Sequence, residues 1–412
     1  MFFRLHNHCH IVKGAKRGAI YNVHSGKVLS INKGALELIT ECQSSPLENL
    51  MDISDPNNQI FLKFLNDLIS KELGSMYILE PDNSLKRTEQ TNDQTLEFLW
   101  LELTSNCNNR CLHCYATSGP CQTTDKVSLE RWLSLISEAR QIGATAIQLI
   151  GGEPLLYPNW RQLIEKASQE GYDYIEVFTN ATTLTDNDIE FFKQYNVNVA
   201  TTIYADNAAV HDQITLNPGS FAKTFSNIKK ILAADLPLRI ASIIMKPNEN
   251  EVENIMKLCG ELGVEVNPPD VVRPTGRGDD KDLLPKNYSK PPIKPPFHTD
   301  NESFARATTF HSCLAGKLAI TSDGDVIPCI FARNQACGNI LEKSLESIVR
   351  GEALQRCWHT TKDKVEKCKD CEYRYACGDC RPLAQGSDSS KRWLACSSEC
   401  SYNPYTGVWE EK

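Results

Sequence analysis

Three cysteines close together in the chain have the spacing of ligands for a metal centre. Cys107, Cys111 and Cys114 form a CxxxCxxC segment. Three thiolates on one loop can bind three corners of a cubane iron–sulfur cluster, which leaves the fourth iron without a protein ligand. An iron of that kind can coordinate a substrate or a cofactor. A zinc site built from the same cysteines is the alternative interpretation of this spacing.

A second group of cysteines lies between residues 313 and 400 and contains the pairs Cys368-x-x-Cys371 and Cys377-x-x-Cys380. Two thiolates separated by two residues can bind one metal ion or two corners of a cluster. The chain has 17 cysteines, clustered at short spacings. Such clustering in a long chain is typical of metal binding in a reducing compartment, and unlike the disulfide framework of a small secreted protein.

The tetrapeptide Gly151-Gly152-Glu153-Pro154 follows a run of apolar residues that predicts a strand. Two glycines allow the backbone to approach a ligand closely, and the Glu153 carboxylate adds a hydrogen-bond acceptor. Tight Gly-Gly turns are common in proteins, so this motif becomes informative only together with the cysteine loop.

The composition excludes several classes of function. A length of 412 residues predicts two or three domains. The formal net charge of −8 gives no general attraction to nucleic acid or to anionic membranes. No apolar run approaches the roughly 20 residues needed to span a bilayer, and residues 1–10 lack the apolar segment of a signal peptide. We therefore expect a cytoplasmic protein without nucleic-acid or membrane partners.

Strands and helices alternate regularly from residue 96 onward, and this order indicates how the motifs are positioned. Apolar runs predict strands over residues 96–103, 144–150, 174–178, 197–203, 238–245 and 264–266. Helical periodicity occupies the intervals between them. This α/β alternation predicts a parallel sheet curled into a partial (β/α)6 barrel, because six units fall short of the usual eight. The polar motifs follow strands, so we expect them at the carboxyl-terminal face, where such sheets place their sites.

The regions on either side of the barrel differ from it in composition. Residues 1–90 predict a winged-helix-like α+β domain that begins with a hairpin over residues 19–30. The barrel is expected over residues 96–284, followed by a Pro-rich linker over residues 285–309. Residues 310–412 have few periodic segments and many cysteines, which predicts a loop-rich domain organised by metal.

Together, the cysteine loop, the Gly-Gly-Glu-Pro turn and the strand–helix order resemble the radical S-adenosylmethionine (SAM) superfamily over residues 96–275. The resemblance implies that Cys107, Cys111 and Cys114 hold a [4Fe–4S] cluster whose open iron is coordinated by the amino and carboxylate groups of SAM. It further implies contacts with SAM from Gly151, Gly152, Glu153, Asn180, Thr202 and Tyr115. Strand-end capping is the alternative role for Asn180 and Thr202.

The chemistry implied by this resemblance is a radical one. The reduced cluster donates an electron to the sulfonium of SAM, the bond to the ribose 5′ carbon breaks, and a 5′-deoxyadenosyl radical abstracts hydrogen from the substrate. The electron comes from a donor such as flavodoxin or ferredoxin. An iron–sulfur electron carrier, the alternative, would need four cysteines at the first loop and would have no use for the Gly-Gly-Glu-Pro turn.

The C-terminal cysteines resemble the SPASM extension of radical SAM enzymes, which carries two auxiliary [4Fe–4S] clusters. The matching pieces are Cys313, Gly324 and Cys329, followed by the paired cysteines. The resemblance implies that auxiliary cluster I is held by Cys313, Cys329 and Cys380. It implies that auxiliary cluster II is held by Cys368, Cys371, Cys377 and Cys396.

Two departures from the SPASM pattern leave some ligands open. The interval between Cys377 and Cys380 is one residue shorter than usual, and His311 stands where a further cysteine is expected shortly before Cys313. Cluster I then has either an open iron or one further ligand, for which the candidates are His311, Cys337 and Cys357. At cluster II, Cys400 competes with Cys396.

The N-terminal domain resembles the peptide-recognition domains of maturases that act on ribosomally made peptides. Such domains bind a leader peptide as an added strand at a sheet edge; a stability or oligomerisation domain is the alternative. The combined resemblance implies an oxidoreductase that abstracts hydrogen from a residue of a precursor peptide, giving a thioether or carbon–carbon crosslink, an epimerisation or a related modification. The alternatives are a maturase of folded proteins such as anaerobic sulfatases, a small-molecule enzyme such as one of tetrapyrrole synthesis, and a zinc-organised binding module.

Overall fold

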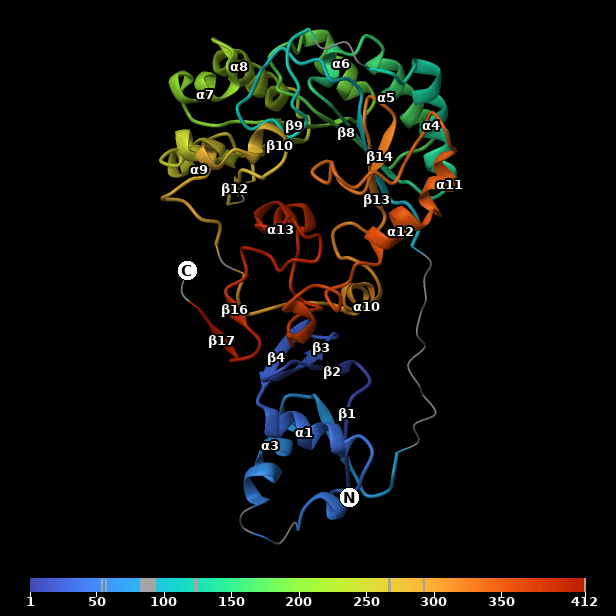
Figure 1. Cartoon of the computed structure of the whole chain (residues 1–412), viewed down its shortest axis with the longest axis vertical. Coiled ribbons are helices and arrows are strands. Elements are labelled where there is room, and N and C mark those ends of the chain that lie inside the picture. Colours follow the sequence, from blue (N-terminus) through green and yellow to red (C-terminus); the bar gives the residue numbers. More distant parts are fainter. Residues whose placement is uncertain are drawn as a thin grey trace.

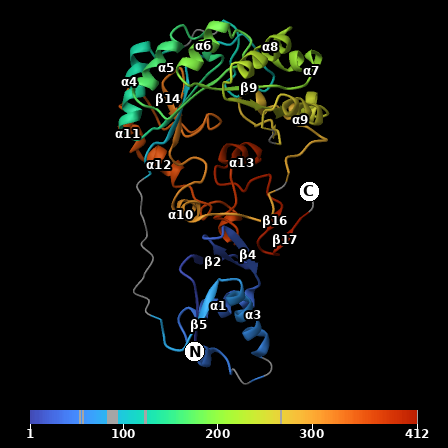
Figure 2. The same ribbon diagram turned by 180° about the vertical axis from the view of Figure 1, so that it is seen from behind.

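The computed structural model describes residues 1–52, 55, 58–81, 94–121, 125–265, 268–291 and 293–410. Three parts follow one another along the long axis of the molecule (Figure 1). The barrel lies at one end, the cysteine-rich part in the middle and the N-terminal part at the other end, and the view from behind shows the same order (Figure 2). The connection between the N-terminal part and the barrel lies mostly outside the described residues.

Parallel strands form the barrel, as the alternation of strands and helices predicts. Five of them are neighbours in one sheet, in the order β10-β9-β8-β7-β6. They are β6 (Phe98–Glu102), β7 (Ala146–Ile150), β8 (Tyr174–Phe178), β9 (Asn198–Thr202) and β10 (Leu238–Ala241). The helices that cover the outside of this sheet (Figure 1) are α4 (Leu129–Gln141), α5 (Trp160–Gln169), α6 (Asp186–Gln194), α7 (Ala208–Thr215), α8 (Ser220–Ala233) and α9 (Val252–Glu261). The expected α/β partial-barrel fold class is therefore confirmed.

The last barrel strands differ from the prediction. The strand expected over residues 238–245 breaks at Ser242, and its second part, β11 (Ile243–Ile244), pairs in parallel with β12 (Asp270–Val271). The Ser242 hydroxyl donates to Ile203 O at 2.8 Å, and the Ser242 carbonyl accepts from the Asp270 amide at 3.1 Å. The strand thus changes its partner at this residue. The strand expected over residues 264–266 reaches into residues outside those described, and β12 begins later, at Asp270.

The C-terminal part adds strands to the barrel sheet. Strand β13 (Lys317–Ile320) pairs in parallel with β6, and β14 (Asp325–Ile327) and β15 (Gly338–Asn339) continue the sheet in antiparallel fashion. One buried core accordingly contains side chains of the barrel together with Phe310, Leu318 and Trp358. The sequence predicts only a loop-rich region here, because a strand of four residues carries little periodicity. The other elements are α10 (Asn301–Thr309), α11 (Leu345–Val349), α12 (Glu352–Trp358), α13 (Arg381–Ser387), β16 (Tyr402–Asn403) and β17 (Val408–Trp409).

The N-terminal part contains a three-stranded and a two-stranded sheet with helices. The strands β2 (Cys9–Lys13), β3 (Gly18–Asn22) and β4 (Lys27–Ile31) form an antiparallel meander, and β1 (Phe2–Leu5) pairs with β5 (Gly74–Tyr77). The hairpin expected over residues 19–30 is confirmed as β3 and β4. The helices are α1 (Lys33–Cys42), α2 (Leu47–Leu50) and α3 (Gln59–Ser70). None of the helices in the described part of the chain combines the length and apolar character that crossing a bilayer requires.

Candidate active site and iron–sulfur sites

The CxxxCxxC loop follows β6 at the carboxyl-terminal face of the barrel, where the sequence predicts the site. The loop borders a cavity of about 370 Å³. Most of the predicted site residues of the barrel line this cavity, although they come from separate segments of the chain: Cys107, Cys111, Cys114, Tyr115, Gly151, Gly152, Asn180 and Thr202.

Gly151 and Gly152 bring the end of β7 against the cysteine loop. The Gly152 amide donates to Thr104 O at 2.7 Å, and the Glu153 amide donates to Asn106 O at 2.9 Å. A Cβ atom at Gly152 would lie 2.3 Å from Asn106 O, and one at Gly151 would lie 2.6 Å from Thr104 O. The sequence predicts that these glycines let the backbone approach a ligand. In the structure they let it approach the loop that carries the ligands of the cluster.

The Glu153 carboxylate lies behind the cavity wall. It is fully buried and accepts hydrogen bonds from Thr179 Oγ1 at 2.6 Å, the Asn180 amide at 2.8 Å and the Leu155 amide at 3.1 Å. Burial raises the pKa of Glu153 to about 7. These bonds tie the turn after β7 to the end of β8. The structure thus gives the carboxylate a positioning role, while a contact between SAM and the backbone at Glu153 stays a prediction.

Side chains at the ends of β8 and β9 contact the cysteine loop itself. Asn180 Nδ2 lies 3.9 Å from the Cys107 sulfur. The Thr202 hydroxyl hydrogen-bonds Tyr204, whose own hydroxyl lies 3.2 Å from His113 Nε2. Burial lowers the pKa of His113 to about 4, so the imidazole is neutral near pH 7. Asn180 and Thr202 both line the cavity, and their contact with SAM stays a prediction.

Arg277 contacts the other side of the loop, and no sequence motif indicates this role. Its side chain donates from Nε to Cys111 O and from Nη2 to Ser118 O, both at 2.8 Å. Its amide donates to Cys114 O at 3.0 Å, and a Cβ atom at the preceding Gly276 would lie 2.6 Å from the same oxygen. A Gly-Arg pair far downstream of the cysteines has no spacing signature, so only the folded chain reveals this contact.

The residues around this loop fit an iron–sulfur cluster with SAM. Burial raises the pKa of the Cys107 and Cys111 thiols to about 12, so these groups release their protons only when a metal binds. The Arg277 cation favours the thiolate form of Cys111. The cavity is therefore lined by cysteines that can ligate iron and by polar side chains that can form hydrogen bonds with SAM.

Cys313, Cys329 and Cys380 come together as the first auxiliary group. Cys329 interacts electrostatically with both Cys313 and Cys380. Arg273, which follows β12, lies between this group and the cavity. Its side chain lines the cavity, its guanidinium carbon lies 4.5 Å from the centroid of the Phe331 ring, and it interacts electrostatically with Cys380.

The three candidates for a fourth ligand of this group differ in their contacts. His311 Nδ1 accepts hydrogen bonds from the amides of Cys313 and Leu314, both at 3.1 Å, and His311 Nε2 lies 3.6 Å from Asp379 Oδ2. The Cys337 thiol donates to Gln335 O at 3.4 Å and interacts with the Cys357 thiol. His311 Nε2 is buried and has no hydrogen-bond partner among the described residues, so the choice between an open iron and a further ligand stays a prediction.

Five cysteines gather at the second auxiliary group and border one pocket: Cys368, Cys371, Cys377, Cys396 and Cys400. The sulfurs of Cys368 and Cys396 lie 3.9 Å apart, and Cys400 hydrogen-bonds Cys396, so both late cysteines lie within reach of the site. Lys362 borders the same pocket, donates to Gly378 O at 2.8 Å and interacts with Cys377. No group of Cys, His, Asp or Glu in the described ranges is arranged to hold a single metal ion; a cubane spaces its ligands more widely.

Replacing Arg273 with glutamine is expected to lower the reduction potential of the cluster held by Cys313, Cys329 and Cys380, because it removes a cation that favours the more negative, reduced state. Arg273→Lys should lower it less. Midpoint potentials from EPR-monitored titration would measure the effect. The matched change, Lys362→Gln, should lower the potential of the other auxiliary cluster instead. Equal shifts of both clusters in either variant would contradict this assignment.

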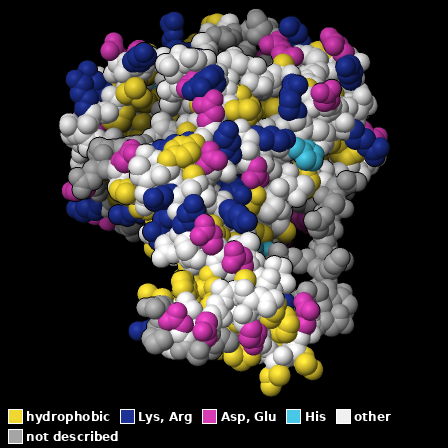
Figure 3. Space-filling view, turned by 60° about the horizontal axis from the view of Figure 1, so that its bottom comes forward, with side chains coloured by type: hydrophobic (Ala, Val, Ile, Leu, Met, Phe, Trp, Pro, Cys, Tyr) yellow, Lys and Arg dark blue, Asp and Glu magenta, His cyan; other side chains and the backbone are white. Residues whose placement is uncertain are grey.

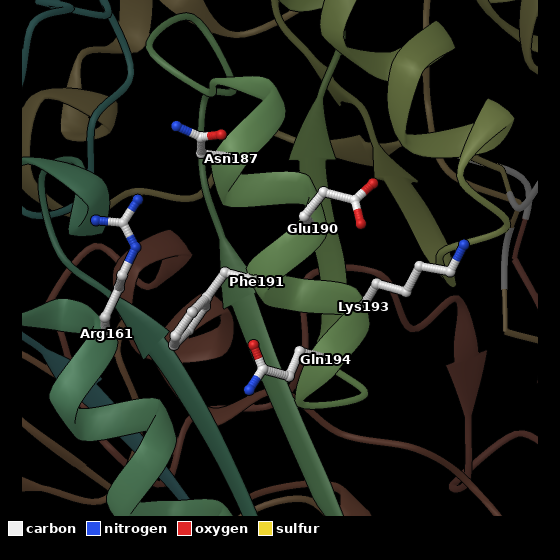
Figure 4. Close-up of a pocket in the computed structure, with 6 residues that line it drawn as sticks. All are labelled: Arg161, Asn187, Glu190, Phe191, Lys193 and Gln194. Carbon is white, nitrogen blue, oxygen red and sulfur yellow. The ribbon is translucent and has the colours of Figure 1, made fainter.

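A further hollow lies outside the barrel, between α5 and α6 (Figure 4). Arg161 projects from α5, and the other residues that line it project from α6: Asn187, Glu190, Phe191, Lys193 and Gln194. Arg161 forms an ion pair with Asp188 and lies over the Phe191 ring. The hollow is a surface feature, remote from the cysteines.

The chain is similar to known proteins in both cysteine-bearing regions. The sequence model of the radical SAM superfamily matches residues 101–259, and that of the iron–sulfur cluster-binding SPASM domain matches residues 313–372. An AdoMet-dependent heme synthase of Methanosarcina barkeri is 27% identical over 337 residues, which are 74% of this chain and 95% of that protein. The subtilosin biosynthesis protein AlbA of Bacillus subtilis is 25% identical over 399 residues, 90% of this chain and 88% of that protein.

A solved structure shares the fold along almost the whole chain. Streptococcus suis SuiB, bound to the precursor peptide SuiA, matches with a TM-score of 0.58 at 13% identity, over 97% of this chain and all of that one. The fold, the cysteine loop beside its cavity and the two family matches agree with one another. The chain is a radical SAM enzyme with a SPASM domain: it belongs to the enzymes that use a [4Fe–4S] cluster with SAM and carry further iron–sulfur clusters.

Proposed function

We propose that this enzyme modifies a ribosomally made precursor peptide. It abstracts hydrogen from one residue of the peptide and leaves a thioether or carbon–carbon crosslink, an epimerised residue or a related change. The N-terminal domain carries this proposal, because the barrel chemistry does not require it. The matches to a bacteriocin biosynthesis protein and to a peptide-bound structure cover nine-tenths or more of the chain, whereas the match to the heme synthase covers 74%.

The residues of the barrel have defined roles in this proposal. When bound and reduced by a donor such as flavodoxin or ferredoxin, the cluster with SAM supplies a 5′-deoxyadenosyl radical. Cys107, Cys111 and Cys114 would ligate three irons, and the turn at Gly152 and the Arg277 side chain hold their loop in place. The buried walls of the cavity exclude water from the reaction. Two auxiliary [4Fe–4S] clusters would be held by Cys313, Cys329 and Cys380 and by Cys368, Cys371, Cys377 and Cys396.

The N-terminal domain offers an apolar surface for a peptide (Figure 3). Its exposed large apolar side chains are Met1, Ile60, Phe61, Tyr77, Ile78 and Leu79. Ile78 and Leu79 are 87% and 81% exposed and directly follow β5, which in the described sheets has β1 as its single partner. A leader peptide that adds a strand to the free edge of β5 would place its side chains near this surface.

The double change Ile78→Ser and Leu79→Ser is expected to weaken leader binding roughly 10- to 100-fold, because it removes apolar area that the leader would bury. Fluorescence anisotropy with a labelled synthetic leader of the precursor peptide would measure the affinity. Leu341→Ser, at a half-exposed leucine outside this domain, is the matched control. An affinity unchanged by the double variant would place the leader site elsewhere.

The central test is anaerobic. The protein is reconstituted with iron and sulfide, and 5′-deoxyadenosine is measured after adding SAM and reductant, with and without the precursor peptide. A variant with Cys107, Cys111 and Cys114 changed to alanine is the control. We expect 5′-deoxyadenosine from the intact protein and none from the variant. The peptide should speed up SAM cleavage and should itself change in mass, and the intact protein should contain about twelve irons per chain. Zinc in place of iron, with no product, would remove the proposed mechanism.

A small-molecule substrate is the second candidate, because the heme synthase match covers 95% of that relative. In the same assay, an iron tetrapyrrole carboxylate replaces the peptide. Turnover stimulated by the tetrapyrrole and not by the peptide would favour this candidate over a peptide maturase. Activity on a folded protein target would be detected by the same comparison with an intact protein substrate.

A further inference from the structure

The turn between β2 and β3 lies against the loop that carries the second auxiliary cysteine group. The Ala15 amide donates to Asp370 O at 2.8 Å, between Cys368 and Cys371. Arg374 Nη1 donates to Lys13 O at 2.7 Å and to Cys371 O at 2.9 Å. The N-terminal sheet and the cysteine loop are therefore joined by one hydrogen bond between backbone groups and one from the Arg374 side chain, although they lie some 350 residues apart along the chain.

The contact continues along the whole segment between Cys371 and Cys377. The Tyr21 hydroxyl donates to Glu372 O at 2.8 Å, and the Ser30 side chain lies close to that of Tyr373. Tyr375 and Ala376 pack against the buried apolar cluster of the N-terminal sheet, which includes Val12, Ala19, Tyr21 and Val23. All five residues between these two cysteines, Glu372, Tyr373, Arg374, Tyr375 and Ala376, thus contact the N-terminal part.

The N-terminal sheet and the segment from Cys371 to Cys377 are closely packed against each other. Tyr21 and Glu372 are both fully buried. A Cβ atom at Gly14 would lie 2.9 Å from the Glu372 amide nitrogen and 2.8 Å from Glu372 Oε2. This loop cannot move away from its partner without breaking the buried hydrogen bond from Tyr21 to Glu372 and the exposed bond from Arg374 to Lys13.

We propose that the N-terminal sheet is a structural wall of the second auxiliary cluster site, in addition to any part it has in binding a leader peptide. The sheet holds the segment from Cys371 to Cys377 in the conformation that ligates the cluster, and it keeps solvent away from that segment. The inference rests on the proposed cluster at Cys368, Cys371 and Cys377, but not on the identity of the substrate. Removing residues 1–80 would therefore damage this cluster together with any leader site, so point variants are the appropriate probes.

The test compares two glycines of the same domain in the full-length, reconstituted protein. Gly14→Ala pushes a methyl group into the Glu372 backbone, whereas Gly34→Ala lies on α1, where the added Cβ would meet only Asn32 Oδ1, at 3.7 Å. Tyr21→Phe is a milder second variant, which removes one hydrogen bond to the loop. Iron release to a chelator is followed anaerobically, together with the EPR signals of the reduced clusters and the formation of 5′-deoxyadenosine.

For Gly14→Ala, about four irons per chain are expected to be released roughly tenfold faster, as when a partner outside the ligand set is lost. One auxiliary EPR signal should weaken with them, while uncoupled SAM cleavage and the Gly34→Ala protein stay at wild-type levels. Tyr21→Phe should show the same selective loss to a smaller extent. Wild-type iron release from both Gly14→Ala and Tyr21→Phe, or iron lost equally from all sites, would overturn the proposal. A wild-type protein without auxiliary signals would instead contradict the proposed cofactor set.

Discussion

Replacing Gly152 with alanine is expected to reduce SAM cleavage at least about 100-fold, as expected when a reacting group is misplaced by about 1 Å. The added Cβ would lie 2.3 Å from Asn106 O and 3.0 Å from the Cys107 Cβ, so the cysteine loop must shift. Because the obstacle is backbone, no side-chain rotation can relieve it. The measurement is 5′-deoxyadenosine formed per minute by the reconstituted protein.

Gly260→Ala is the control for this change. Gly260 lies on α9, and nothing lies within 4 Å of a Cβ atom built there. Iron analysis separates two mechanisms. A Gly152→Ala protein with about eight irons in place of about twelve has lost its first cluster, whereas a full complement would show a cluster held in the wrong position for SAM. Full activity of the variant would show that the contact between the turn and the loop is not needed.

Replacing Arg333 with methionine is expected to lower the free energy of unfolding by about 3–5 kcal/mol, the usual effect of leaving one member of a buried ion pair alone. Arg333 Nη1 and Nη2 donate to the two oxygens of Glu102, both at 2.8 Å. Glu102 is buried at the end of β6, and Arg333 lies in the connection between β14 and β15 of the C-terminal part. The pair thus joins the barrel to that part. Anaerobic denaturant unfolding would measure the loss.

Two comparisons make this stability prediction specific. Arg350→Met breaks an exposed ion pair with Glu346, which is worth about 0–1 kcal/mol. Burial raises the pKa of Glu102 above that of an exposed carboxyl, and loss of Arg333 raises it further. In the folded variant, Glu102 then binds a proton that it has released in the unfolded chain. The loss in free energy of unfolding caused by Arg333→Met should therefore grow as the pH rises and shrink as the pH falls. An equal penalty at pH 6 and pH 8 would contradict an unpaired Glu102 as the cause.

The cysteine loop and its neighbouring turn can be predicted from the sequence because each is a short, contiguous motif. The spacing of Cys107, Cys111 and Cys114 and the pair Gly151-Gly152 can be recognised within a few residues, and the strands that carry them are strongly apolar. Arg277 and Arg273 could not be predicted in this way. Each arginine contacts residues that are distant along the chain, and an isolated arginine has no periodicity or spacing from which such a contact could be predicted.

Glu153 shows a different limit. The sequence predicts Glu153 at the site, and the structure confirms that its turn lies there. Its carboxylate, however, accepts hydrogen bonds from Thr179 and Asn180 and does not face the cavity. A side chain next to a backbone turn can face either side, and only the packing decides which. The contact between the N-terminal sheet and the second cysteine group could not be predicted either, because residues 13–21 and 370–376 share no sequence pattern.

The parallel pairing of β13 with β6 has a consequence for shortening this protein. A version that ends before residue 310 would keep the whole CxxxCxxC loop, but β6 would lose its neighbour and become an edge strand. An unprotected edge of this kind recruits strands from other molecules. We therefore expect the isolated barrel to aggregate. A fragment that keeps the CxxxCxxC loop without aggregating should extend at least through Ile320.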